Sequence, residues 1–168
     1  MTAKADSDVR RIALASDHAG FELKTELIAH LKQRGREPLD LGTNSTDSVD
    51  YPDYADRVAS RVSRGEVKEG ILICGTGIGM PMTANKYPNV RAAVATTPFM
   101  AKMSRAHNDA NILCLGGRVV DAKAAVEILD AWLREPFEGG RHERRVAKIR
   151  AHDRELPPCG SRSDSKKK

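Results

Sequence analysis

Short apolar runs alternate with amphipathic stretches along most of this chain. The run at Arg11–Ser16 stops at a polar loop, and the stretch after it carries apolar residues at helical spacing until Gly35. The same pattern recurs down the sequence. It predicts strands at Arg11–Ser16, Glu37–Leu41, Gly70–Cys74, Arg91–Ala95 and Asn111–Leu115. It predicts helices at Phe21–Arg34, Asp53–Arg64, Gly79–Lys86, Pro98–Ala106, Ala122–Leu133 and Arg141–His152.

Alternating strands and helices favour a parallel sheet that is covered on both faces. The strand Gly70–Cys74 is apolar throughout, as a strand buried on both faces should be. We therefore expect an α/β fold, a three-layer α/β/α Rossmann-like domain with a five-stranded parallel sheet. Residues 10–155 should form this single domain. A flexible N-terminus (1–9) should precede it and a disordered basic tail (156–168) should follow.

Ligands of such sheets bind outside the carboxyl ends of the strands. The strand order is not readable from the pattern, but three polar segments follow predicted strands. They are Asp17–Gly20, Cys74–Gly79 and the segment after Ala95. We expect these three segments to lie near one another.

Composition and charge narrow the class of protein. Apolar residues make up 40% of the 168 residues and charged residues 30%, as in soluble globular proteins. The net charge is +5, and residues 141–168 hold ten of the 28 basic residues but only four of the 23 acidic ones. The rest is nearly neutral and lacks a basic stripe with stacking aromatics, so we expect no nucleic-acid partner.

Neither a membrane partner nor a metal site is expected. No apolar run is long enough to span a bilayer, and the N-terminus lacks the apolar core of a secretory signal, so the expected location is cytoplasmic. The cysteines Cys74, Cys114 and Cys159 form no CxxC pair, which argues against a zinc site or a disulfide framework.

The sequence CGTGIG, residues 74–79, places a thiol at the start of a glycine loop. It does not match a Walker loop, because Met80 stands five residues after Gly75 and no lysine is in reach. Its glycines form GxGxG and not the GxGxxG dinucleotide fingerprint, and Met80 stands where a Cys-x5-Arg phosphatase loop needs arginine. Glycines allow a ligand to approach the backbone closely, and successive N–H groups attract negative charge. A thiol beside such a loop can act as base or nucleophile. The alternative is a buried cysteine that ends a strand before a tight turn.

Two further polar groups lie at element boundaries. Asp17 and His18 follow the first strand and can bind a ligand or move protons, or can form a helix cap and turn. His107, Asn108 and Asp109 stand between a helix and a strand. A histidine there suits proton transfer, but the same residues also suit a capping turn.

The last predicted helix carries Arg141 and Arg145 four residues apart, on one face. Two guanidinium groups on one face make a phosphate clamp, although a solvated basic helix end is the simpler interpretation. Tyr51 either lines a pocket or only packs against neighbouring side chains. The sequence patterns assign no role to His142, which lies on the same predicted helix.

Taken together and in order, these motifs carry a specific resemblance. The segments ASDHAGFELK, DYPDYA, GILICGTGIGM, RAAVAT, SRAHNDANILCLGGRVV and FEGGRHERRV closely resemble the ribose-5-phosphate isomerase B family, which includes related hexose-phosphate isomerases. The match covers about residues 10–150. Family members interconvert aldose and ketose sugar phosphates without a metal or cofactor. Some carry glutamate at the position of Cys74, and many have small residues where this chain has Pro81 and Thr83.

The resemblance implies roles for individual residues. The catalytic group is Cys74 as the base, Thr76 with the loop amides on the enediolate, and His107 with Asp17 in opening the sugar ring. The remaining site residues contact the substrate: His18, Arg141, Arg145 and Arg118 at the phosphate, Asn108 at the enediolate, and Tyr51, Gly75, Gly77 and Gly79 around the sugar. Arg118 belongs to the same or a second subunit.

The resemblance implies an isomerase of ribose 5-phosphate and ribulose 5-phosphate in the pentose phosphate pathway. It also implies a homodimer or tetramer with each active site at a subunit interface. Two alternatives stay open. One is an isomerase of allose or galactose 6-phosphate, and the other is a sugar-phosphate-binding module without catalysis. Which of Asp17 and His107 dominates ring opening is also open.

Overall fold

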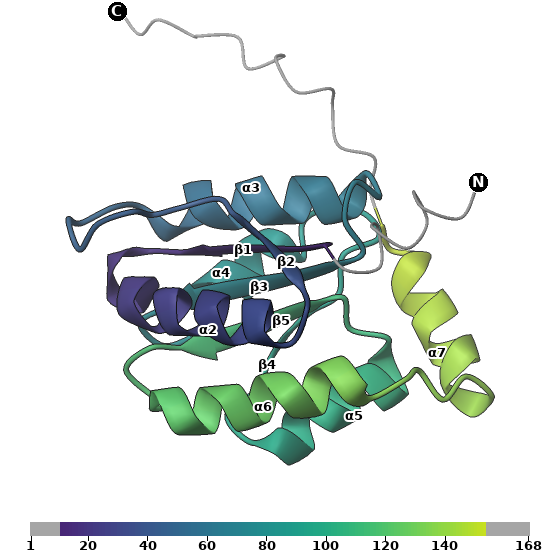
Figure 1. Cartoon of the computed structure of the whole chain (residues 1–168). Helices are drawn as coiled ribbons and strands as arrows, with labels where there is room; N and C mark the ends of the chain where they lie inside the picture. The colour runs from purple at the N-terminus through teal and green to yellow at the C-terminus, as the bar shows by residue number, and fades with distance from the viewer. Residues whose placement is uncertain (1–10, 154–168) are drawn as a thin grey trace, which may run out of the picture.

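A five-stranded, all-parallel sheet forms the middle of the molecule (Figure 1). The structure is a computed structural model that describes residues 11–153. The strands are β1 (Arg11–Ser16), β2 (Glu37–Asp40), β3 (Glu69–Cys74), β4 (Ala92–Val94) and β5 (Ile112–Gly116). Their order across the sheet is β2-β1-β3-β5-β4. The predicted fold class is confirmed.

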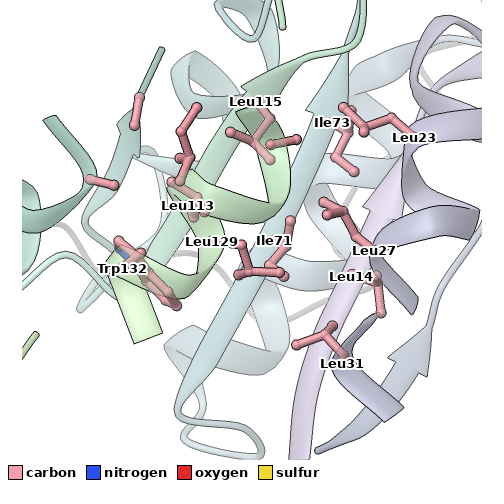
Figure 2. Packing of buried hydrophobic residues seen from close by; sticks show 14 of the residues in the cluster. Leu14, Leu23, Leu27, Leu31, Ile71, Ile73, Leu113, Leu115, Leu129 and Trp132 are labelled. Carbon is pink, nitrogen blue, oxygen red and sulfur yellow. The ribbon is translucent and has the colours of Figure 1, made fainter. Parts of the chain in front are cut away.

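The helices cover both faces of this sheet. They are the short η1 (His18–Gly20), α2 (Phe21–Gln33), α3 (Tyr51–Ser63), α4 (Gly79–Ala84), α5 (Pro98–Asn108), α6 (Ala122–Arg134) and α7 (Arg141–Arg150). Apolar side chains of α2, α5 and α6 pack on one face, where Leu27, Leu129 and Trp132 meet Ile71 and Leu113 (Figure 2). Those of α3 and α4 pack on the other face. Alternate residues of each strand therefore enter opposite cores, as the strand period of two requires.

Local chemistry explains where the helices begin and end. Thr97 caps α5 by accepting a hydrogen bond from the Met100 N–H (3.2 Å), and Asp121 caps α6 by accepting one from the Ala124 N–H (2.8 Å). α3 begins at Tyr51, two residues before its predicted start, because Pro52 fits the first turn of a helix. α4 ends at Ala84, two residues before its predicted end, and holds Pro81 in its first turn as expected.

The strand order adds detail to the expectation about the three loops. The segment after Ala95 follows β4 at the same carboxyl-end edge, with β5 between β4 and β3. The neighbour of the Cys74 loop is the turn after β5, which contains Gly117 and Arg118. The Gly117 N–H donates to the Cys74 carbonyl (2.8 Å) and the Arg118 N–H donates to the Gly75 carbonyl (3.0 Å).

The predicted flexible ends, 1–9 and 156–168, lie outside the described residues. Among residues 11–153, no helix has both the length and the apolar character needed to cross a membrane.

Candidate active site

The carboxyl ends of β1 and β3 bring the first two polar loops together. The Asp17 N–H donates to the Ile73 carbonyl (3.1 Å), so this loop is tied to the strand that carries Cys74. Asp17 is 6% exposed, and its carboxylate accepts a hydrogen bond from the Gly20 N–H (3.0 Å). The capping role considered for Asp17 is therefore present, at a position next to the glycine loop. His18 Nδ1 accepts a hydrogen bond from the Val49 N–H (3.3 Å) and thereby holds the 41–50 connection.

Cys74 closes β3 with its sulfur inside the glycine loop. The side chain is 4% exposed, and its Sγ accepts a hydrogen bond from the Gly77 N–H (3.2 Å). Gly77 has φ +79°, and a Cβ there would lie 2.9 Å from the Gly116 nitrogen. Glycine is thus required at this position both for its backbone angle and for the close approach of β5. The loop fixes the sulfur in one place, while Thr76 stays exposed beside it.

Two side chains from other elements border this loop. The ring of Tyr51, the first residue of α3, packs on Gly79, where an added Cβ would lie 2.7 Å from the ring. The guanidinium of Arg118 lies over Gly75, with Nη1 3.4 Å from the position of a Cβ on that glycine. Arg118 therefore borders the Cys74 loop of its own chain. All these groups lie at the carboxyl-end edge of the sheet, which we call the base edge. Its members are Asp17, His18, Tyr51, Cys74, Gly75, Thr76, Gly77, Gly79 and Arg118.

Cys114 provides a contrast within the same core. It lies on β5, the strand beside Cys74, and is 0% exposed. Burial is the main reason that the pKa of the Cys114 thiol is raised well above its ordinary value, and the nearby Cys74 adds to the effect. This buried position in a strand suits a structural cysteine.

The other predicted site residues lie at the opposite edge of the sheet. His107 and Asn108 end α5, just before β5 begins, and α7 carries Arg141 and Arg145 beyond the same edge (Figure 1). The neighbouring Arg105 reaches Glu69, the first residue of β3 (3.3 Å). Because Cys74 is the last residue of that strand, a strand length of about 17 Å separates the two groups. We call His107, Asn108, Arg141 and Arg145 the arginine edge.

His142 joins the arginine edge, although the sequence patterns gave it no role. Its ring is 4% exposed and stacks on the ring of His107, with centroids 4.2 Å apart and planes 5° from parallel. Arg141 Nε donates to His142 Nε2 (3.2 Å). A signal for this placement exists in the sequence, since His142 and the buried Val146 are four residues apart and share one face of α7.

His107, Glu138 and His142 also bring three atoms that can bind a metal within 4.8 Å of one another. Their geometry does not suit one ion. A metal bound to an imidazole nitrogen lies in the plane of that ring, along its lone pair, and two stacked parallel planes share no such point. The Nε2 atom of His142 is also occupied by the Arg141 donor. A ring would have to rotate before these residues coordinated a metal together.

Comparison with known proteins identifies the family of this chain. The family model described as Ribose/Galactose Isomerase matches residues 12–149. The chain belongs to this family. It is 51% identical to ribose-5-phosphate isomerase B of Escherichia coli over 143 residues, which are 85% of this chain and 96% of that protein.

Solved structures agree in fold. The structure of ribose-5-phosphate isomerase B from Clostridium thermocellum aligns with a TM-score of 0.83 and 53% identity, covering 84% of this chain and 95% of that one. The enzyme from Mycoplasma genitalium, solved with bound ribulose-5-phosphate, aligns with a TM-score of 0.82 and 44% identity over 84% of this chain and 94% of the other. These alignments span nearly the whole domain, as the sequence resemblance predicted.

Proposed function

We propose that this protein interconverts ribose 5-phosphate and ribulose 5-phosphate, as an aldose–ketose isomerase of the pentose phosphate pathway. The observation that carries the proposal is the position of Cys74. A sulfur atom held by the Gly77 N–H stands at the mouth of a glycine loop, with Asp17, Tyr51 and Arg118 around it. The names of the E. coli and M. genitalium relatives support the choice of a pentose phosphate.

In the proposed reaction, the Cys74 thiolate removes the proton from C2 of the open-chain aldose. The electrons of that C–H bond form the C1=C2 double bond, and the C1 carbonyl oxygen becomes the oxyanion of a cis-enediolate. The hydroxyl proton on the C2 oxygen then moves to the C1 oxygen. Cys74 returns its proton to C1, and the C2 oxygen becomes the new carbonyl. The base and the oxyanion donors must therefore face neighbouring atoms of the substrate. The glycine loop places both in one short segment.

The remaining roles are assigned in the same proposal. Thr76, the loop amides and Asn108 stabilise the enediolate. His107, with Asp17, moves the protons of ring opening, and Tyr51 contacts the sugar. His18, Arg118, Arg141 and Arg145 hold the phosphate. The phosphate is remote from the reacting carbons along the sugar chain, so gripping it supplies binding energy that orients those carbons.

We further infer that a complete site requires two copies of the chain. The base edge and the arginine edge of one chain are about a strand length apart, which exceeds the reach of one open-chain pentose phosphate. Exposed apolar side chains border the base edge, as expected for a face that another protein surface covers: Ile78, Met82, Phe99, Met100 and Val119. A second copy on this face would bring its own His107, Arg141 and Arg145 to Cys74, in a homodimer or in a tetramer built from such dimers.

Turnover of ribose 5-phosphate, without added metal, tests the proposal. The wild type should be active, and Cys74→Ala should lose activity by about 100-fold or more. Cys114→Ala is the matched control, because it removes a buried thiol from the neighbouring strand and should keep kcat within about twofold.

The alternatives correspond to other outcomes of the same assay. Allose 6-phosphate and galactose 6-phosphate serve as parallel substrates, and activity on these alone would replace the pentose assignment. Binding of sugar phosphates without any turnover would indicate a binding module. Unchanged activity in Cys74→Ala would remove the base from Cys74. The cytoplasmic location and the absence of a cofactor, a nucleic-acid partner and a membrane partner stay predictions.

A further inference from the structure

His142 occupies an unusual position for a residue that contacts no proposed reacting atom. It lies between two groups of the arginine edge, stacked on His107 and hydrogen-bonded to Arg141. The segment that leads into α7 is tied to the same place, because the Glu138 N–H donates to the Ala106 carbonyl (3.0 Å), one residue before His107. The His142 N–H donates to the Gly139 carbonyl (3.0 Å). Both backbone and side chain of this region therefore converge at His107.

The hydrogen bond from Arg141 fixes the protonation of the His142 ring. A guanidinium group only donates hydrogen bonds, so the ring nitrogen that accepts this hydrogen bond must carry a lone pair. The accepting atom is His142 Nε2 (3.2 Å). A charged imidazolium has no free lone pair, so this hydrogen bond requires a neutral His142 whose single ring proton lies on Nδ1.

We propose that His142 is a positioning residue, in its neutral Nδ1–H form, that holds the Arg141 guanidinium and the His107 ring in place for catalysis. This inference rests on the proposed function, in which Arg141 grips the phosphate and His107 moves protons. One buried ring would then connect the grip on the substrate with the proton-transfer group.

The charges around His142 agree with a neutral ring. Burial is the main cause that lowers the pKa of His142, and the nearby His107, Arg141 and Arg145 lower it further. Glu138 acts in the opposite direction, with its Oε2 3.6 Å from His142 Nε2 and 3.9 Å from His107 Nε2. Two imidazolium rings stacked at 4.2 Å would repel each other. A neutral His142 avoids this repulsion.

The first test needs no turnover. Nitrogen-15 NMR of the histidine side chains in the full-length protein, at pH 7.5, reports which ring nitrogen carries the proton. The inference expects a neutral His142 with the proton on Nδ1. A proton on Nε2, or a charged ring, overturns it. Because this measurement does not depend on the reaction, its outcome is separate from that of the Cys74→Ala assay.

The second test separates the two contacts with a pair of variants. His142→Phe keeps the stacked, buried ring but removes the acceptor for Arg141, so the KM for ribose 5-phosphate should rise by about tenfold with kcat changed less. His142→Gln offers a side-chain oxygen to Arg141 but no ring, so kcat should fall by about tenfold with KM changed less. His152→Phe, at an exposed position beyond α7, is the matched control.

A purely structural role predicts a different result. If both His142 variants lower kcat and raise KM together, or if neither parameter changes, the positioning role is wrong. Thermal unfolding of each variant shows whether a loss of activity reflects loss of fold. Where turnover proves too weak to measure, inorganic phosphate titrated into the protein replaces KM. Its affinity should fall in His142→Phe and stay within about threefold in His142→Gln.

Discussion

The two edges of the sheet are built in different ways. At the base edge, backbone groups fix the site, since the Asp17 N–H, Gly77 N–H and Gly117 N–H all donate to residues 73–74. At the arginine edge, side chains on helices form the site, and Arg141 and Arg145 remain exposed. The base edge is thus held rigidly by neighbouring strands of the sheet, whereas the arginine edge presents its charged groups outward.

This difference corresponds to what each edge would have to do. Proton abstraction next to a carbonyl requires the base and the oxyanion donors to be fixed within a fraction of an ångström. A phosphate clamp needs reach and charge, which long arginine side chains on an exposed helix supply. The comparison therefore predicts that mutations at the two edges fail differently, and that neither edge works alone.

The largest change in activity should appear when a variant of the base edge and a variant of the arginine edge are combined in one dimer. Cys74→Ala and His107→Ala should each lower kcat by about 100-fold or more. Co-expressed, the two variants should regain about a quarter of wild-type activity, because half of the dimers are mixed and each mixed dimer contains one intact site. Steady-state assays on the total dimer fraction measure this recovery, and different tags on the two chains show that mixed dimers form.

A same-edge pair controls for that experiment. Mixing His107→Ala with Arg141→Gln leaves no intact site in any dimer, so the activity of the mixture should not exceed that expected from the two variants measured separately. Mixed dimers of Cys74→Ala and His107→Ala that form but stay inactive would contradict the shared site.

The next largest effect, on the KM for ribose 5-phosphate, distinguishes a specific phosphate clamp from general attraction by surface charge. Arg141→Gln and Arg145→Gln should each raise the KM for ribose 5-phosphate by about 10- to 100-fold, since a charge-assisted hydrogen bond to phosphate is lost. Arg144→Gln removes an exposed arginine from the same helix and should change KM by less than about threefold. Equal effects at all three positions would indicate general electrostatic attraction instead of a clamp.

A smaller effect tests the rigidity of the base edge. Gly77→Ala places a Cβ 2.9 Å from the Gly116 nitrogen, a backbone atom that cannot move cheaply, at φ +79°. Its free energy of unfolding should fall by about 2–3 kcal/mol, and kcat should fall with it. Gly65→Ala has a similar backbone angle, φ +72°, but nothing within 4 Å of the new Cβ. This control should cost about 1 kcal/mol and leave kcat unchanged.

Urea denaturation and turnover of the two glycine variants measure the difference. If Gly77→Ala and Gly65→Ala lose equal stability and both keep full kcat, the base edge tolerates displacement, and the contrast between the two edges does not hold.

Much of the fold was predictable because each strand is short, apolar and followed by a polar break. The bounds of β1 agree with prediction, those of β3 differ by one residue at the start, and those of β5 are shifted by one residue at both ends. The strand order was not predictable, because the chain passes from β3 to the sheet border at β4 before it returns to β5. That choice depends on how the connecting helices pack on the sheet, which local patterns do not contain. For the same reason, the sequence did not reveal that the turn after β5 is the neighbour of the Cys74 loop.

The sequence was sufficient to predict that the site residues of one chain lie apart. In a parallel sheet, residues that follow a strand and residues that precede one lie at opposite edges. Cys74 follows β3, whereas His107 precedes β5, so one chain cannot bring them together. The role inferred for His142 was beyond reach, because it depends on a stacking contact between α5 and α7 that spacing along either helix does not reveal.

The smallest effect concerns the stability of the arginine edge as pH changes. Burial and nearby cations lower the pKa of His142 from the usual 6.5 in the folded protein. Between the lowered value and 6.5 the unfolded chain binds more protons at this residue, so the contribution of His142 to folding stability is present above about pH 6.5 and is lost as pH falls. The wild type should therefore lose more stability between pH 7.5 and 5.5 than His142→Gln does. Urea denaturation at both pH values measures the two losses, with His152→Gln as control for the removal of an imidazole. Equal losses in the wild type and in His142→Gln would mean that His142 accepts a proton as readily in the folded protein as in the unfolded chain, and that the arginine edge does not depend on a neutral ring.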